Sequence, residues 1–177
     1  MNDPFNTPAA PGFDDPLEML QACHGRITAQ CVTLRRLISH LQMQGNDEQA
    51  AQAARAILRY FDTAAQHHHQ DEEQDLFPAL LASGDTAAAS HIERLLGEHK
   101  LMEQSWRALR PLLLAIAEDR ADTLDTVVAT QFIDRYARHI EFENGTLLPL
   151  AQQLLADEQL QRIGQNMAAR RGVTHGQ

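Results

Sequence analysis

The chain has 177 residues, a mass of 19.8 kDa and a formal net charge of −9 at pH 7. A chain of this length with 44% hydrophobic and 22% charged residues is expected to form one folded domain rather than a disordered segment. Its acidity argues against binding to nucleic acid, and its longest apolar run, Leu112 to Ala117, is much shorter than the ~20 residues that cross a bilayer.

The chain is expected to begin with a flexible arm over residues 1–13, which mix Pro, Gly, Asn and Asp. Asp14-Asp15-Pro16 then predicts a helix start, because acidic residues and proline favour the first turn. On this helix one stripe recurs at three- and four-residue spacing: Leu17, Leu20, His24, Ile27, Cys31, Leu34, Ile38 and Leu41. Gly45 follows the stripe and suits a left-handed C-terminal cap.

Three more long helices and one short helix are expected after Gly45. The same helical spacing runs from Ala54 to Leu76, from Ile92 to Leu113 and from Leu124 to Leu147. Polar breaks near residues 83–85 and 118–120 separate these stretches, a short helix covers about residues 157–170, and a flexible tail covers 172–177. The folded domain is therefore expected to span residues 14–171.

Four long helices joined by short loops predict an all-α, up-down-up-down four-helix bundle with a short C-terminal fifth helix. The two cysteines, Cys23 and Cys31, would lie ~12 Å apart along one helix axis, which is too far for a disulfide. The acidic, proline-rich N-terminal stretch also lacks the basic flank and apolar stretch of a signal peptide. These features indicate a reducing, cytoplasmic location.

Two segments of the chain match each other at an offset of 71 residues. Each has a histidine, a glutamate four residues later, then two apolar residues and a proline: His68, Glu72, Leu76, Phe77 and Pro78 correspond to His139, Glu143, Leu147, Leu148 and Pro149. Residues i and i+4 project from the same face of a helix, so each segment offers one imidazole and one carboxylate to a common point. His24 and His99 precede the two segments by 44 and 40 residues.

The spacing of these histidines places them at one depth in a bundle. If consecutive antiparallel helices hold their histidines at the same level, each loop must lie midway between them. The midpoints are Asn46, the boundary between Ser83 and Gly84, and Asp119, and each falls in a predicted turn.

Six side chains are therefore predicted to converge as metal ligands in the bundle core: His24, His68, Glu72, His99, His139 and Glu143. Burying such groups without compensation costs kilocalories each, and cations remove that cost. Mixed imidazole and carboxylate ligands suit iron, manganese or zinc. If both glutamates bridge two ions, a six-coordinate ion keeps two positions for solvent, an oxo bridge or a small diatomic molecule.

At these residues the chain resembles the hemerythrin-like (HHE cation-binding) family. The resemblance rests on His24 and on the segments HHHQDEEQDLFPAL, EHKLMEQSW and HIEFENGTLLPLA, and it covers about residues 17–155. The closing segment of this chain, QRIGQNMAARRG, also resembles bacterial members of the family. It implies a four-helix bundle with two iron ions in a non-heme di-iron centre, bridged by oxo or hydroxo. It also implies one of two roles. The first is the binding or sensing of a small diatomic ligand, O2 or NO. The second is iron handling, which means the storage or delivery of iron or the repair of iron centres.

Two positions differ from the oxygen-carrying hemerythrins. Those proteins have a second histidine where this chain has Glu103, four residues after His99, and an aspartate five residues after the last histidine, where this chain has Glu143 at four. The resemblance therefore favours the H-HxxxE-H-HxxxE subgroup, which is linked to NO, redox or iron chemistry, over reversible O2 carriage.

Two other functions stay open from the sequence. A carboxylate-bridged di-iron oxidase or peroxidase of the ferritin-like kind would use Glu-x-x-His pairs, and none of the nine histidines has a glutamate three residues before it. A metal-independent helical interaction module would use the histidines only structurally. His69 with Glu73 forms another i, i+4 pair outside the repeat, and Glu103 is either a further ligand, an outer partner of a ligand or a surface residue.

Overall fold

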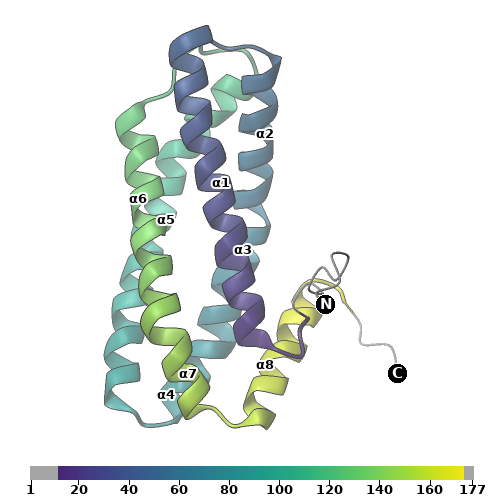
Figure 1. The fold of residues 1–177 in the computed structure, drawn as a ribbon, viewed down its shortest axis with the longest axis vertical. Coiled ribbons are helices and arrows are strands. Elements are labelled where there is room, and N and C mark those ends of the chain that lie inside the picture. Colours follow the sequence, from purple (N-terminus) through teal and green to yellow (C-terminus); the bar gives the residue numbers. More distant parts are fainter. Residues whose placement is uncertain (1–11, 174–177) are drawn as a thin grey trace, which may run out of the picture.

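The computed structural model describes residues 12–173, and the rest of the predicted arm and tail, 1–11 and 174–177, lies outside the described residues. Within that range the regular structure is helical, with no strand, and the predicted all-α bundle with a fifth C-terminal helix is confirmed (Figure 1). The elements are α1 (Pro16–Gln44), α2 (Glu48–Asp62), α3 (Ala64–Asp71), η1 (Glu72–Leu76), α4 (Phe77–Ala82), α5 (Thr86–Ala117), α6 (Thr126–Phe142), η2 (Glu143–Leu147), α7 (Leu148–Leu154) and α8 (Asp157–Arg170).

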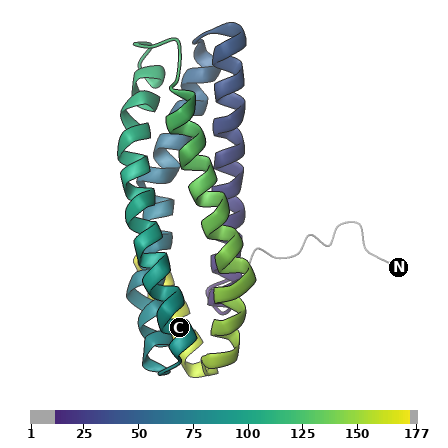
Figure 2. The same ribbon diagram turned by 90° about the vertical axis from the view of Figure 1, so that its left-hand side faces the viewer.

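These elements build four long rods that run side by side, as both views of the ribbon show (Figures 1 and 2). The first rod is α1, the second runs from α2 to α4, the third is α5, and the fourth runs from α6 to α7. Turns separate the rods at all three predicted midpoints. No helix in the described range is long and apolar enough to cross a membrane.

Local sequence signals set the ends of the rods. The carboxylates of Asp15, Asp47, Asp85 and Asp125 each accept a backbone N–H of the first turn that follows, which satisfies donors that have no partner within the helix. Gly45 follows α1 with φ of +76°, a conformation that glycine adopts without steric cost.

The second and fourth rods are not continuous α-helices, contrary to the simple expectation. Both contain a π-helical turn, η1 and η2, in which Phe77 donates its N–H to the Glu72 carbonyl and Leu148 donates to the Glu143 carbonyl, five residues back. A proline follows each turn, Pro78 or Pro149, and a proline ring crowds the carbonyl four residues before it and supplies no N–H. The repeated proline therefore widens the turn directly after each predicted glutamate ligand.

The apolar core is divided into two clusters. One cluster packs residues from the middle and far end of α1, such as Ile27 and Leu34, against α2, α5 and α6. The other packs Leu17 and Leu20 against η1, α4, α7 and α8. His24 lies between Leu20 and Ile27 in the chain, so the predicted ligands occupy a polar layer between two apolar regions.

The fifth helix, α8, lies beside the lower half of the bundle and contacts α1, α3 and η1 (Figure 1). Its buried residues Ile163 and Met167 join the second apolar cluster. At Gly164 a Cβ atom would lie 1.9 Å from the carbonyl oxygen of Phe13, so only glycine allows this approach of the N-terminal backbone to α8.

Candidate metal centre

All six predicted ligands meet in the polar layer of the bundle. Each side chain is at most 4% exposed, although all six are polar or charged. They come from all four rods: His24 from α1, His68 and Glu72 from the second rod, His99 from α5, and His139 and Glu143 from the fourth rod.

The Glu72 carboxylate lies between two groups of imidazoles. Its Oε1 atom is 3.2 Å from His68 Nε2 and 3.7 Å from His24 Nε2. Its Oε2 atom is 3.3 Å from His99 Nε2. The two oxygens of one carboxylate therefore face opposite halves of the site.

Glu143 is shared in the same way. Its Oε2 atom is 3.0 Å from His24 Nε2, and its Oε1 atom is 3.2 Å from His139 Nε2. Glu72 and Glu143 thus each offer one oxygen to a pair formed by His24 and His68 and the other oxygen to a pair formed by His99 and His139.

Most of the inward-facing ligand atoms lie close together without a hydrogen bond between them, although the Nε2 atoms of His99 and His139 are 3.2 Å apart. All four carboxylate oxygens of Glu72 and Glu143, and the Nε2 atom of His24, are buried and have no hydrogen-bond partner. Unpaired buried carboxylates are rare because each costs several kilocalories. Carboxylate oxygens that lie within 3.0–3.3 Å of imidazole nitrogens and yet have no hydrogen-bond partner are arranged as a cation at each of the two points would require.

His69 adds a third imidazole to one half of the site. Ligand atoms of His69, Glu72, His99 and His139 lie within 4.8 Å of one another, as do those of His24, His68, Glu72 and Glu143. The His69 ring stacks on the His99 ring at 4.1 Å, and its Nε2 atom is buried without a partner. The 71-residue repeat matches His68 with His139 but His69 with Ile140. The repeat therefore favours His68 as a ligand and gives no reason to include His69.

Outer side chains orient three of the imidazoles. The Nδ1 atom of His24 lies 2.6 Å from Asn144 Oδ1, and that of His99 lies 2.6 Å from Glu73 Oε1. The Nδ1 atom of His139 lies 2.8 Å from Glu98 Oε2. An acceptor at Nδ1 fixes the ring and leaves Nε2 available toward the centre, as metal-binding histidines require.

The outer partners follow the internal repeat. Glu73 directly follows Glu72 and bonds to His99 of the second repeat. Asn144 directly follows Glu143 and bonds to His24 of the first repeat. Glu98 precedes His99 in the chain, and Cys23 holds the equivalent position before His24. The sequence pattern pairs Glu73 only with His69 and gives no sign of Glu98 or Asn144, whose partners lie on other rods.

The buried carboxylates of the site favour positive charge on the imidazoles next to them. Burial opposes protonation of His24, yet the neighbouring Glu143 and Glu72 carboxylates outweigh it and raise its pKa to about 10. His99, beside Glu72 and Glu73, shows the same balance, with its pKa also raised to about 10. Burial, followed by the charge of His99, lowers the pKa of His69 well below 6.5.

A cavity of about 360 Å³ reaches the His69 side of the site. His69 and His99 form part of its wall, together with Tyr136 and Trp106. Glu103 lies on the same wall, but its side chain is 57% exposed and its carboxylate is 2.5 Å from Arg107. Of the readings that the sequence left open for Glu103, the structure therefore favours a surface residue.

Within the described residues, the histidines at 40 and 91 and the two cysteines belong to neither group of ligand atoms. His40 bonds to Asp47 at 2.9 Å, His91 packs against Phe142 at 5.2 Å between ring centroids, and His175 lies outside the described residues. Cys23 and Cys31 are buried free thiols.

Comparison with known proteins agrees with this geometry. The family model described as "Hemerythrin HHE cation binding domain" matches residues 15–151. A protein of Haemophilus influenzae that is described only as uncharacterized is 32% identical over 161 residues, which cover 91% of this chain and 92% of that protein.

Proposed function

Because the chain belongs to the hemerythrin HHE cation-binding family, we propose that it binds two iron ions as a non-heme di-iron protein and acts on a small diatomic ligand, O2 or NO, or in iron handling. The observation that carries the proposal is the pair of shared carboxylates, Glu72 and Glu143, whose four oxygens are buried without partners between two groups of imidazoles. One cation held by each group compensates all four oxygens at once.

The donor set fits iron. Imidazole nitrogens and carboxylate oxygens are typical iron ligands, and the absence of thiolate from both groups disfavours metals that prefer sulfur. Iron supplies the redox and diatomic-binding chemistry when it is bound. His24, His68, His99, His139, Glu72 and Glu143 would hold the two ions, and His69 would add a nitrogen to one of them.

The two groups are unequal in the number of ligand atoms that they offer. The group around His24 and His68 supplies two nitrogens and two carboxylate oxygens. The group around His99 and His139 supplies the same set plus the nitrogen of His69. The first group would therefore leave an ion with one protein ligand fewer, because the repeat places Ile140 in the position equivalent to His69.

The residues around the ligand layer shield it and fix the orientation of its imidazoles. The two apolar clusters shield the ligand layer along the length of the bundle, and Glu73, Glu98 and Asn144 hold three imidazoles with Nε2 inward. We place the protein in the cytoplasm, because both thiols are free and buried. Its net charge of −9 disfavours nucleic acid as a partner.

Metal analysis of the purified protein tests the proposal. We expect about two irons per chain after anaerobic loading with Fe(II), and an absorption change when O2 or NO is added. A His68→Ala, His139→Ala double variant removes one nitrogen from each group and should lose both the iron and the absorption change. Folded wild-type protein that takes up no iron would contradict the proposal and favour the metal-independent interaction module.

A further inference from the structure

A buried carboxylate next to Glu72 is held by the end of the C-terminal helix. Asp71 is 0% exposed and has no part in either imidazole group. The Arg170 guanidinium pairs with Asp71 Oδ1, and Arg171 Nη2 donates to Asp71 Oδ2 at 2.6 Å. Two cations thus compensate one carboxylate whose burial would otherwise be very costly.

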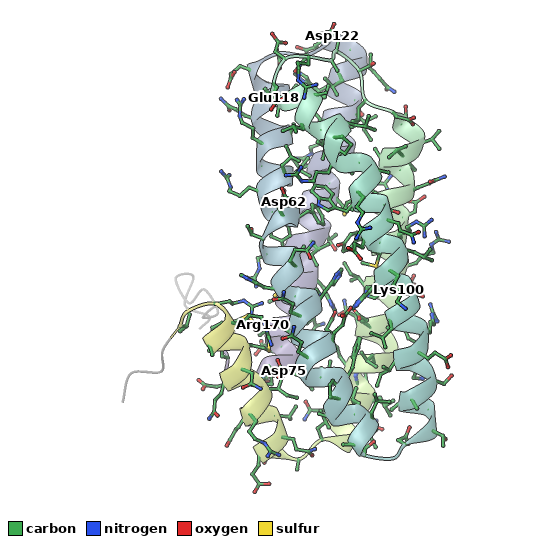
Figure 3. All side chains as sticks on the ribbon, turned by 180° about the vertical axis from the view of Figure 1, so that it is seen from behind. Asp62, Asp75, Lys100, Glu118, Asp122 and Arg170 are labelled. Carbon is green, nitrogen blue, oxygen red and sulfur yellow. The ribbon has the colours of Figure 1, made fainter. Side chains whose placement is uncertain are left out.

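The same helix end also holds the π-helical turn that follows Glu72. Arg170 Nη2 donates to Asp75 Oδ2 at 2.7 Å and to Gln74 Oε1 at 3.2 Å. Asn166, one turn earlier on α8, donates to Asp75 Oδ1 at 2.6 Å. Arg170 and Asp75 lie together where α8 meets the bundle (Figure 3).

The second half of the repeat has no such clamp. In the 71-residue repeat, Phe142 corresponds to Asp71 and Thr146 corresponds to Asp75. Phe142 packs instead beneath the Arg94 guanidinium, whose central carbon is 3.8 Å from the ring centroid. Both π-helical turns are bonded to a histidine of another rod, η2 through Asn144 and His24 and η1 through Glu73 and His99. Among the described residues, the turn that carries Glu72 is the one that also receives side-chain hydrogen bonds from α8.

We propose that Arg170 and Arg171 are positioning residues for Glu72, which makes α8 part of the metal centre rather than a separate appendage. Without the two guanidiniums, the buried Asp71 carboxylate loses both of its ion-pair partners and must turn toward water or repack within the bundle. Asp71 and Glu72 are neighbours at the junction of α3 and η1, so either response moves the Glu72 carboxylate out of its shared position. The inference rests on the proposed metal binding.

Cobalt binding by the full chain tests the inference. Co(II) accepts the same nitrogen and oxygen donors, and its visible absorption depends on the number and geometry of its ligands. The test variant is Arg170→Gln, Arg171→Gln, and the matched control is Arg162→Gln, an exposed arginine on the same helix. A second control, Ile163→Ala, loosens the packing of α8 and leaves the clamp residues in place. Urea unfolding of the metal-free proteins measures how much each change costs in stability.

We expect the double variant to bind Co(II) at least 10-fold more weakly than the wild type, with an altered absorption spectrum, as for loss of a partner that orients a ligand. Arg162→Gln should match the wild type, and Arg170→Lys, Arg171→Lys should restore part of the affinity because it keeps both charges. If the double variant does not fold, Arg170→Gln alone tests the inference, because it removes the one donor shared by Asp71, Gln74 and Asp75 while Arg171 keeps Asp71 compensated; a smaller loss of affinity with an altered spectrum is then expected, and an unchanged spectrum would overturn the inference.

Wild-type affinity and spectrum in a folded double variant would overturn the inference and leave the proposed function intact. It would also be overturned if Ile163→Ala, at equal loss of unfolding free energy, changed the cobalt spectrum equally. A wild-type protein that binds no Co(II) would overturn the proposed function along with it.

Discussion

Replacing Glu72 by glutamine tests the shared-carboxylate arrangement. Glu72 is fully buried, and its two oxygens face different imidazole groups, so Glu72→Gln removes negative charge from both groups with almost no change in shape. We expect the variant to fold and to lose most of the stabilisation that metal provides.

The size of the effect follows from binding linkage. A ligand at 100 times its Kd stabilises the native state by about 2.7 kcal/mol, so two ions contribute about 5 kcal/mol. In a domain of this size each kilocalorie per mole moves Tm by about 2–4 °C, so metal should raise the wild-type Tm by roughly 10–20 °C. If the variant binds both ions ~100-fold more weakly, each contributes only ~0.4 kcal/mol at the same concentration and Tm rises by roughly 2–3 °C.

Thermal unfolding followed by circular dichroism, without metal and with anaerobic Fe(II), measures this difference. Glu103→Gln is the matched control, because Glu103 is an exposed glutamate on α5 whose carboxylate pairs with Arg107. It should keep the full metal-dependent rise in Tm. A Glu72→Gln variant with the same rise as the wild type would refute the shared-carboxylate arrangement.

Three further predictions concern other parts of the molecule. His69→Ala should weaken the binding of one of the two metal equivalents and leave the other unchanged, whereas His67→Ala, its neighbour outside the cluster, should leave both as in the wild type; isothermal titration separates the two equivalents. Glu98→Gln should lower metal affinity about 10- to 100-fold, because it weakens the acceptor that orients one imidazole, and the same titration would expose an unchanged affinity as a contradiction. The Arg110 guanidinium holds the pKa of Asp62 below its usual 3.8, so Asp62 stabilises the fold above that pH and loses this effect as the pH falls through its folded pKa. Asp62→Asn should therefore lower the free energy of unfolding by up to about 1 kcal/mol at pH 7, and urea unfolding should show the difference from the wild type closing below pH 3.8.

The four-helix bundle and the common depth of the ligands along it could be predicted from the sequence, because both depend on regular spacing of residues. His24 and His99 each lie on an apolar stripe with helical spacing, and the midpoints between consecutive histidines fall on turns, so the position of each along its rod follows from counting. A straight antiparallel helix pair converts sequence distance into depth with little ambiguity.

The parts that the sequence did not predict depend on rotation and on distant contacts. His69 lies one residue after His68, and only the break at Thr63 and the actual rotation of α3 decide that both rings face inward. Glu98 and Asn144 reach imidazoles on other rods, which single-helix patterns do not encode. The contact of Arg170 with Asp71 spans 99 residues, and no local signal announces it.

The positions of the bound ions test the central claim most directly. Anomalous diffraction at the iron edge, from crystals of the iron-loaded protein, locates each ion relative to its ligands. The account predicts two ions per chain, one beside His24 and His68 and one beside His99 and His139, with Glu72 and Glu143 touching both. A single ion, or ions outside the ligand layer between the two apolar clusters, would contradict it.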